Sequence, residues 1–114
     1  MKARLPQGFG PQNQQQLLKQ YQKMQEDMQT LTAELEAREH TVTAGGGQVE
    51  LTMNGEYNVT AVKIKPEIVD PEDIEMLEDL LAAAVNEGVR VVKETSDTEM
   101  GKLTSGLNLP AGLL

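Results

Sequence analysis

The residue types that most often carry enzyme chemistry are scarce in this sequence. His40 is the only histidine, and the 114-residue chain contains no cysteine. A catalytic triad or a zinc site needs more partners than one histidine, so we interpret His40 as a side chain at a junction between two elements. Ser96 and Ser105 lie in polar stretches that lack the pattern of a basic partner. We therefore expect no catalytic residue, no resident metal and no cofactor.

Three other segments could suggest ligand sites, but each departs from the motif it approaches. Gly45-Gly46-Gly47 lacks the later Gly-Lys-Ser/Thr of a phosphate-binding loop, and residues 101–104 have leucine where the hydroxyl residue belongs. Residues 67–79 hold seven Asp and Glu without the residue order of a calcium-binding loop. We interpret these segments as turns, helix breaks and solvated surface.

Basic residues at helical spacing offer a different chemistry, namely contact with phosphates. Lys19 and Lys23 are four residues apart, Arg90 and Lys93 are three apart, and Lys102 follows. Such pairs are usually ordinary exposed residues on the polar face of a helix, without a binding role. In a two-fold dimer, however, they would be repeated on separated arms, which suits contact with the backbone of a duplex. The spacing alone favours neither DNA nor a protein as the partner.

The net charge argues against nucleic acid, but its distribution does not. The chain has 10 Lys and Arg against 18 Asp and Glu, which gives a formal charge of −8. Residues 1–25 contain four basic residues and no acidic one, whereas residues 67–79 contain seven acidic residues and no basic one. Without that acidic block the chain has 10 basic residues against 11 acidic ones. A polyanion is therefore expected to meet the N-terminal part of the chain.

A helix with one narrow apolar seam is predicted from Leu17 to about Glu39. Residues 1–16 are rich in Gln, Gly and Pro, so we expect them to form a flexible arm. The following apolar residues are spaced by alternating steps of four and three, which is the pattern of a coiled-coil seam. This seam requires another helix to pack against. Its members are Leu17, Tyr21, Met24, Met28, Leu31 and Leu35.

Three strands are predicted next, because the apolar period falls to two. A short strand at Thr41 to Ala44 precedes a glycine turn, residues 48–53 form the second strand, and residues 57–65 return after Asn54-Gly55. Apolar residues occur on both faces of the third strand. Either a bulge shifts its register or both of its faces are covered.

A second helix is predicted with Asp70 as its N-cap and Pro71 as its first helical residue, and it is predicted to run to about Leu103. One face carries Ile74, Leu77, Leu81, Ala84, Val85, Gly88 and Val92. We therefore expect a single α+β domain at residues 17–104, in which a three-stranded antiparallel sheet lies between two helices in the chain order. Residues 105–114 are broken by Gly and Pro yet apolar, so we expect a tail that docks on a partner surface.

Two long helices present more apolar surface than a three-stranded sheet can cover, so we expect a homodimer. A monomeric helical hairpin resting on the sheet is the alternative. The longest apolar run is Leu80 to Val85, too short to span a membrane, and no targeting segment is evident, so an intracellular protein without a membrane partner is expected. The residues assigned to the dimer interface are Val49, Leu51, Met53, Leu81 and Val85.

Several stretches, in order and without large insertions, closely resemble the YbaB/EbfC family of bacterial nucleoid-associated proteins. The resemblance covers residues 17–110 and rests on residues 17–28 (LLKQYQKMQEDM), 44–55 (AGGGQVELTMNG), 62–67 (VKIKPE), 69–73 (VDPED) and 100–110 (MGKLTSGLNLP).

This resemblance implies an intertwined, tweezer-like homodimer that binds duplex DNA in the bacterial cytoplasm and nucleoid. It carries over the basic positions Lys19, Lys23 and Lys102, while Arg90 and Lys93 are extrapolated from helix geometry. Tyr21 departs from the small residue expected in many relatives. Because related genes often lie beside those of a clamp-loader subunit and a recombination protein, replication or recombination proteins are further candidate partners. We therefore expect a non-enzymatic DNA-binding protein of low or modest sequence specificity. The alternative is a protein-interaction module that recruits a DNA replication or repair protein through its helices and its apolar C-terminal tail.

Overall fold

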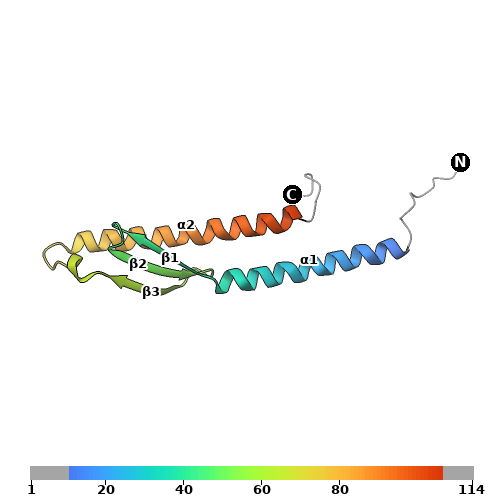
Figure 1. The fold of residues 1–114 in the computed structure, drawn as a ribbon, viewed down its shortest axis with the longest axis horizontal. Coiled ribbons are helices and arrows are strands. Elements are labelled where there is room, and N and C mark those ends of the chain that lie inside the picture. Colours follow the sequence, from blue (N-terminus) through green and yellow to red (C-terminus); the bar gives the residue numbers. More distant parts are fainter. Residues whose placement is uncertain (1–10, 107–114) are drawn as a thin grey trace.

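The computed structural model describes residues 11–106 of the chain, with side chains for residues 14–105. It contains a long helix, a three-stranded antiparallel sheet and a second long helix, as predicted (Figure 1). The sheet order is β1-β2-β3, so β2 is the central strand. The elements are α1 (Pro11–Ala37), β1 (Glu39–Ala44), β2 (Val49–Asn54), β3 (Val59–Ile64), the short 3-10 helix η1 (Pro66–Ile68) and α2 (Ile74–Gly106).

Helix α1 begins earlier than predicted. Residues 11–16, which the sequence assigned to a flexible arm, form its first turns. Proline is well tolerated at the first helical position, and glutamine has good helix propensity, so a Gln-rich composition did not prevent helix formation. The remainder of the expected arm, residues 1–10, lies outside the described residues. With 27 residues, α1 is about 40 Å long.

The β1–β2 connection is the predicted glycine turn. Gly45, Gly46 and Gly47 have φ values of 62°, 67° and 94°, a region that residues with a Cβ rarely adopt. The Gln48 N–H donates a hydrogen bond to the Gly45 carbonyl across the turn. This turn sets the register in which Val42 pairs with Leu51.

Of the two alternatives predicted for β3, a bulge or cover on both faces, the structure contains the bulge. Thr52 pairs with Ala61 and Met53 pairs with Val59, so Thr60 is the extra residue of a β-bulge. The alternative, a strand covered on both faces, is wrong, because most of β3 is exposed. In the turn before it, the Asn54 Oδ1 accepts hydrogen bonds from the N–H groups of Glu56 (2.9 Å) and Asn58 (3.1 Å).

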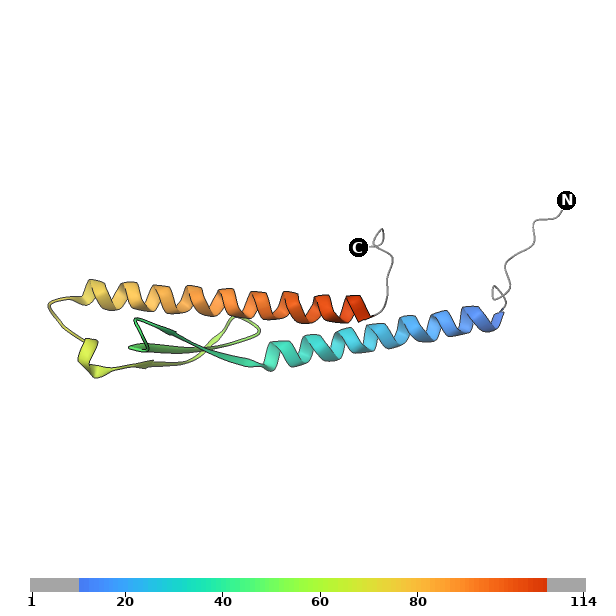
Figure 2. The same cartoon turned by 45° about the horizontal axis from the view of Figure 1, so that its top comes forward.

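The core lies between one face of the sheet and α2, which runs along β1 and β2 (Figure 2). Val49, Leu51 and Met53 point from β2 into this core and are at most 1% exposed. Gly88 lets α2 approach them: a Cβ at this position would lie 3.2 Å from both Leu51 Cδ2 and Met53 Cε. The small residue is therefore part of the packing between helix and sheet.

Helix α2 begins at Ile74, so the prediction of an N-cap at Asp70 is wrong by three residues. The Asp73 Oδ1 accepts the Met76 N–H (3.3 Å) and is the cap. The Asp70 Oδ1 instead accepts the Glu72 N–H (2.9 Å) and stabilises the preceding turn. At its other end, α2 continues to Gly106, past the predicted stop at Leu103. The rest of the expected tail, residues 107–114, lies outside the described residues.

Candidate nucleic-acid interface

Lys19 and Lys23 lie one turn apart on α1, and both are exposed. At about 3.6 residues per turn, they face away from the seam residues Leu17 and Tyr21, each of which lies two positions earlier. Within the described part of the chain, no carboxylate lies within 4.0 Å of either ammonium group. The two lysines therefore present their full charge to solvent.

The two lysines also lie on a part of α1 that projects from the body of the molecule. Both views show that α1 extends well past the point where α2 ends (Figures 1 and 2). Leu17 and Tyr21, on this projecting part, are 62% and 57% exposed, whereas Leu35, near the base of the helix, is 7% exposed. The described residues thus form a packed body with one projecting helical arm.

The base of this arm is joined closely to the β2–β3 turn. The Gly55 N–H donates a hydrogen bond to the Glu36 carbonyl (3.1 Å), which satisfies a backbone group at the end of α1. A Cβ on Gly55 would lie only 1.7 Å from the Leu35 carbonyl oxygen. Only glycine permits this approach, so Gly55 helps to set the direction in which the arm projects.

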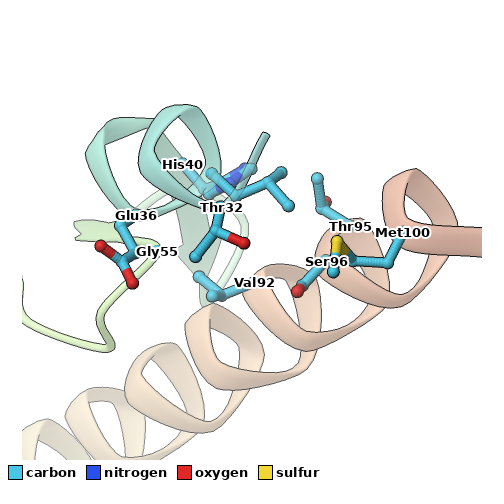
Figure 3. A pocket seen from close by; sticks show the side chains of 9 residues that line it. Thr32, Glu36, His40, Gly55, Val92, Thr95, Ser96 and Met100 are labelled. Carbon is cyan, nitrogen blue, oxygen red and sulfur yellow. The ribbon is translucent and has the colours of Figure 1, made fainter. Parts of the chain in front are cut away.

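A pocket of about 260 Å³ lies at the same joint, between α1, the sheet and α2 (Figure 3). His40, the only histidine, lines this pocket at the start of β1, together with Glu36 and Ser96. Among the described residues, no three His, Asp or Glu side chains are grouped closely enough to hold a metal ion. His40 occupies the junction that the sequence predicted, where it borders the space between arm and body.

Arg90 differs from the lysines of α1, because its guanidinium is already paired with two carboxylates. Its guanidinium forms ion pairs with Glu87 and, at 2.8 Å, with Glu94. These hydrogen bonds raise the pKa of Arg90 above its usual range, and the bond from Arg90 lowers the pKa of Glu87. A phosphate would have to displace both carboxylates. The local charge of these three side chains is −1, which makes Arg90 a poor phosphate contact.

The other basic residues are spread over the body. Lys93 is exposed on α2, and the Lys102 Nζ lies 3.8 Å from the Glu99 Oε1. Sequence reasoning did not single out Lys63 and Lys65, which border a shallow groove beside Gly47 at the β1–β2 turn. The two-residue spacing of Lys63 and Lys65 in a predicted strand places both side chains on one face and could have identified this pair. Lys63 lies 4.0 Å from Glu50, so it too has an acidic neighbour.

The residues assigned to a dimer interface fall into two groups. Val49, Leu51 and Met53 are already buried in the core of one chain, so their side chains have no surface for a second copy. This part of the assignment is corrected by the packing of α2 on β2. Leu81 is partly buried beside the same core, and Val85 is 38% exposed.

Comparisons with known proteins find one family model and several bacterial relatives that match most of the chain. Residues 10–107 match the model of the YbaB/EbfC DNA-binding family. The chain is 48% identical over 103 residues to a nucleoid-associated protein of Clostridium acetobutylicum, covering 90% of this chain and 92% of that protein. It is 50% identical over 100 residues to a nucleoid-associated protein of Agathobacter rectalis, covering 88% of each.

The fold is also found in a solved structure. An uncharacterized protein from Helicobacter pylori has a similar arrangement, with a TM-score of 0.65 and 24% identity, covering 79% of this chain and 95% of that one. At this identity the likeness concerns the fold alone. Within residues 11–106, neither helix has a stretch both long enough and apolar enough to cross a membrane.

Proposed function

Since the chain belongs to the YbaB/EbfC DNA-binding family, we propose that it is a non-enzymatic, nucleoid-associated protein that binds duplex DNA as a homodimer in the bacterial cytoplasm. The observation that carries this proposal is the pair of exposed lysines, Lys19 and Lys23, on a projecting helix whose described N-terminal half has no acidic residue up to Gln25. The lysines contact phosphates, and sequence specificity is low.

Phosphate contact fits these residues better than base recognition. A lysine ammonium is a compact point charge, whereas bases are usually read by paired donors and acceptors such as those of Arg, Asn or Gln. Contacts to phosphates carry no direct sequence information. A site made of two lysines therefore holds many duplexes with similar affinity.

The acidic block does not oppose this mode of binding, because it lies at the other end of the molecule. Glu72, Asp73 and Glu75 lie around the start of α2, far from the projecting end of α1 (Figure 1). Charges separated by much more than about 8–10 Å are largely screened at physiological salt. The net charge of −8 therefore weakens approach of the body to DNA without cancelling the field near Lys19 and Lys23.

A second copy is proposed to cover the part of the sheet that α2 leaves open. Val59 and Val62 lie on the same face of the sheet as the core residues of β2, yet each is 44% exposed. Val85 and Val89 of α2 are 38% and 39% exposed. Together these four valines, the valine surface, form an apolar area of the kind that marks protein interfaces.

The valine surface is continuous by helix geometry. Leu80 packs at the β1–β2 turn, where its Cδ2 would lie 2.8 Å from a Cβ on Gly45. Val85 and Val89 lie on the opposite flank of α2, about 140° and 180° around the helix from Leu80. They therefore face the side of the sheet on which β3 lies. Burial of this surface between two copies leaves two arms, each with its own Lys19 and Lys23.

The dimer is tested by Val62→Asp, with the neighbouring Ala61→Asp as a matched control. Ala61 lies on the opposite face of β3, because it pairs with Thr52. Light scattering is expected to give twice the chain mass of 12.5 kDa for the wild type and Ala61→Asp, and 12.5 kDa for Val62→Asp. A Val62→Asp protein that keeps twice the chain mass would place the interface elsewhere.

Recruitment of a replication or recombination protein is the second candidate function. The observation that favours it is the exposure of Leu17, Leu18 and Tyr21 on α1. Gel shift with duplex DNA at low salt separates the two candidates. Retardation by the wild type supports DNA binding, whereas a folded protein that fails to retard DNA supports the recruitment function.

A further inference from the structure

The projecting part of α1 carries an apolar strip with no partner among the described residues. Leu17, Leu18 and Tyr21, the arm strip, are 62%, 60% and 57% exposed. Together with Gln14 they line a shallow open groove of about 390 Å³. The Tyr21 hydroxyl accepts a hydrogen bond from Gln25 (2.8 Å), so one edge of the ring is held against the helix. Three adjacent large apolar side chains at this exposure mark a binding surface.

The strip lies beyond the level at which α2 ends. The two helices run in opposite directions, and Thr32 of α1 and Met100 of α2 border the same pocket (Figures 2 and 3). Beyond this level α2 continues for six residues to Gly106, while α1 continues much further. The apolar seam of α1 therefore loses its helical neighbour before it reaches Tyr21.

The chain that follows α2 has the composition of a suitable occupant. Residues 107–114 read Leu-Asn-Leu-Pro-Ala-Gly-Leu-Leu, with four leucines and no ionisable side chain. We propose that this segment, the leucine segment, continues the line of α2 and packs on the arm strip of the same chain. It thereby stiffens the arm that carries Lys19 and Lys23, and leaves those lysines open because they lie on the other face.

The leucine segment is long enough to cover the strip. From Thr32 to Leu17, α1 rises about 22 Å, and from Met100 to Gly106, α2 rises about 9 Å. About 14 Å then separates the end of α2 from the level of Leu17. Eight extended residues span about 26 Å, so even a bent path reaches this level. On this proposed path, Leu109 would reach the level of Tyr21.

Two arguments favour this occupant over a second copy. A segment joined directly to α2 is present at a millimolar effective concentration next to the strip, which no independent chain reaches. The surface proposed for dimerisation, the valine surface, lies on the body and does not include the strip. Failure of the leucine-segment proposal would therefore leave the proposed dimer interface unaffected, and failure of that interface would leave the leucine-segment proposal unaffected.

Disulfide trapping tests the contact directly, since the chain contains no cysteine of its own. The test variant is the full chain with Tyr21→Cys and Leu109→Cys, and the matched control carries Gln16→Cys and Leu109→Cys. Gln16 is exposed on the opposite face of α1. A disulfide requires Cα atoms about 4.4–6.8 Å apart, so only the test variant is expected to cross-link in high yield under mild oxidation.

The position of the cross-link is read by mass spectrometry on mixed isotope-labelled and unlabelled chains. A link within one chain, formed at Tyr21→Cys and not at Gln16→Cys, is the expected result. Equal yields in test and control would overturn the proposal, because the segment would have no preferred face. A link between two chains would also overturn it, and would assign the strip to a second copy.

Hydrogen exchange provides a second readout without cysteines. The full chain is compared with a version that stops at Gly106, which leaves the core residues in place. Removal of the leucine segment is expected to cause loss of protection at the amides of residues 17–24, with the sheet unchanged. Equal protection in the two proteins would contradict the proposal.

Discussion

The joint between Gly55 and the end of α1 makes a sharp prediction for Gly55→Ala. The added Cβ would lie 1.7 Å from the Leu35 carbonyl oxygen and 2.5 Å from its carbonyl carbon. Real contacts of a Cβ essentially never fall below 3.0 Å, so the turn and the helix end must separate by about 1.3 Å. Both partners are backbone, so a side-chain rotation cannot relieve the overlap.

The cost follows from what this separation breaks. The hydrogen bond from the Gly55 N–H to the Glu36 carbonyl would stretch from 3.1 Å beyond a useful length, at about 1 kcal/mol. Part of the packing of Leu35 is lost as well, so a destabilisation of roughly 2–3 kcal/mol is expected. In a domain of this size that lowers the Tm by on the order of 10 °C.

Two assays and one control make the prediction decisive. Circular dichroism gives the Tm, and gel shift gives the DNA affinity, which should fall because Lys19 and Lys23 change direction with the arm. Gly46→Ala is the control: it also replaces a turn glycine, but a Cβ there meets nothing within 4 Å. Its cost is limited to its φ of +67°, roughly 1–2 kcal/mol. A Gly55→Ala protein with wild-type Tm and wild-type DNA affinity would refute the reasoning.

Three further predictions concern the packing of α2, its N-cap and an ion pair on its surface. Gly88→Leu should overpack the contact with Leu51 and destabilise the fold by roughly 1–3 kcal/mol, measured by denaturant titration. The control Gly101→Ala, whose added Cβ meets nothing within 4 Å, should be neutral or stabilising. Equal effects of the two substitutions would contradict the packing of Gly88 against the sheet. Asp73→Ala should cost about 1 kcal/mol by removing the N-cap, and an unchanged midpoint would return the cap to the position predicted from sequence. Because Arg90 lowers the pKa of Glu87 from 4.5, their ion pair stabilises the fold above pH 4.5, and this stabilisation is lost as the pH falls through the lowered pKa. The Tm of Arg90→Gln should therefore decrease less between pH 7 and pH 3 than the Tm of the wild type. An equal decrease in the two proteins would contradict this pairing.

The order of elements was predictable because it depends on periodicity, which the sequence states directly. The two-residue alternation around Leu51 and the three consecutive glycines specify a strand and a turn whatever surrounds them. Helix ends were less predictable. Composition alone suggested a flexible arm up to residue 16, and Asp70 and Asp73 are both suitable caps, so the choice between them depended on the path of η1 and the turn after it.

For the basic residues, exposure was predictable from the sequence, but ion pairing was not recognised. The spacing of Lys19 and Lys23 identified one exposed face of α1. The ion pairs of Arg90 were not recognised, although Glu87 and Glu94 stand three and four positions away and could have suggested them. Burial of Val49, Leu51 and Met53 by α2 of the same chain could not be read from alternation, because a strand face covered by a helix and one covered by a second chain have the same pattern.

The role of Gly55 could not be predicted either. Its sequence context, Asn-Gly, indicates a turn, but the carbonyl of Leu35 that makes glycine necessary comes from another element. Such contacts depend on the tertiary arrangement and not on local preference. The arm is thus a local feature of the sequence, while the joint that directs it is a feature of the fold.

The central claim, that Lys19 and Lys23 hold the phosphates of a duplex, is tested most directly by the salt dependence of DNA binding. The variant Lys19→Ala with Lys23→Ala is compared with Lys63→Ala, whose lysine is near Glu50 on the body. Each phosphate contact contributes about 0.9 to the slope of log K against log salt. In the proposed dimer four contacts are lost, so the slope should decrease in magnitude by about 3–4 on several unrelated duplexes, while Lys63→Ala keeps the wild-type slope. A double variant that remains dimeric and keeps the wild-type slope would contradict the account.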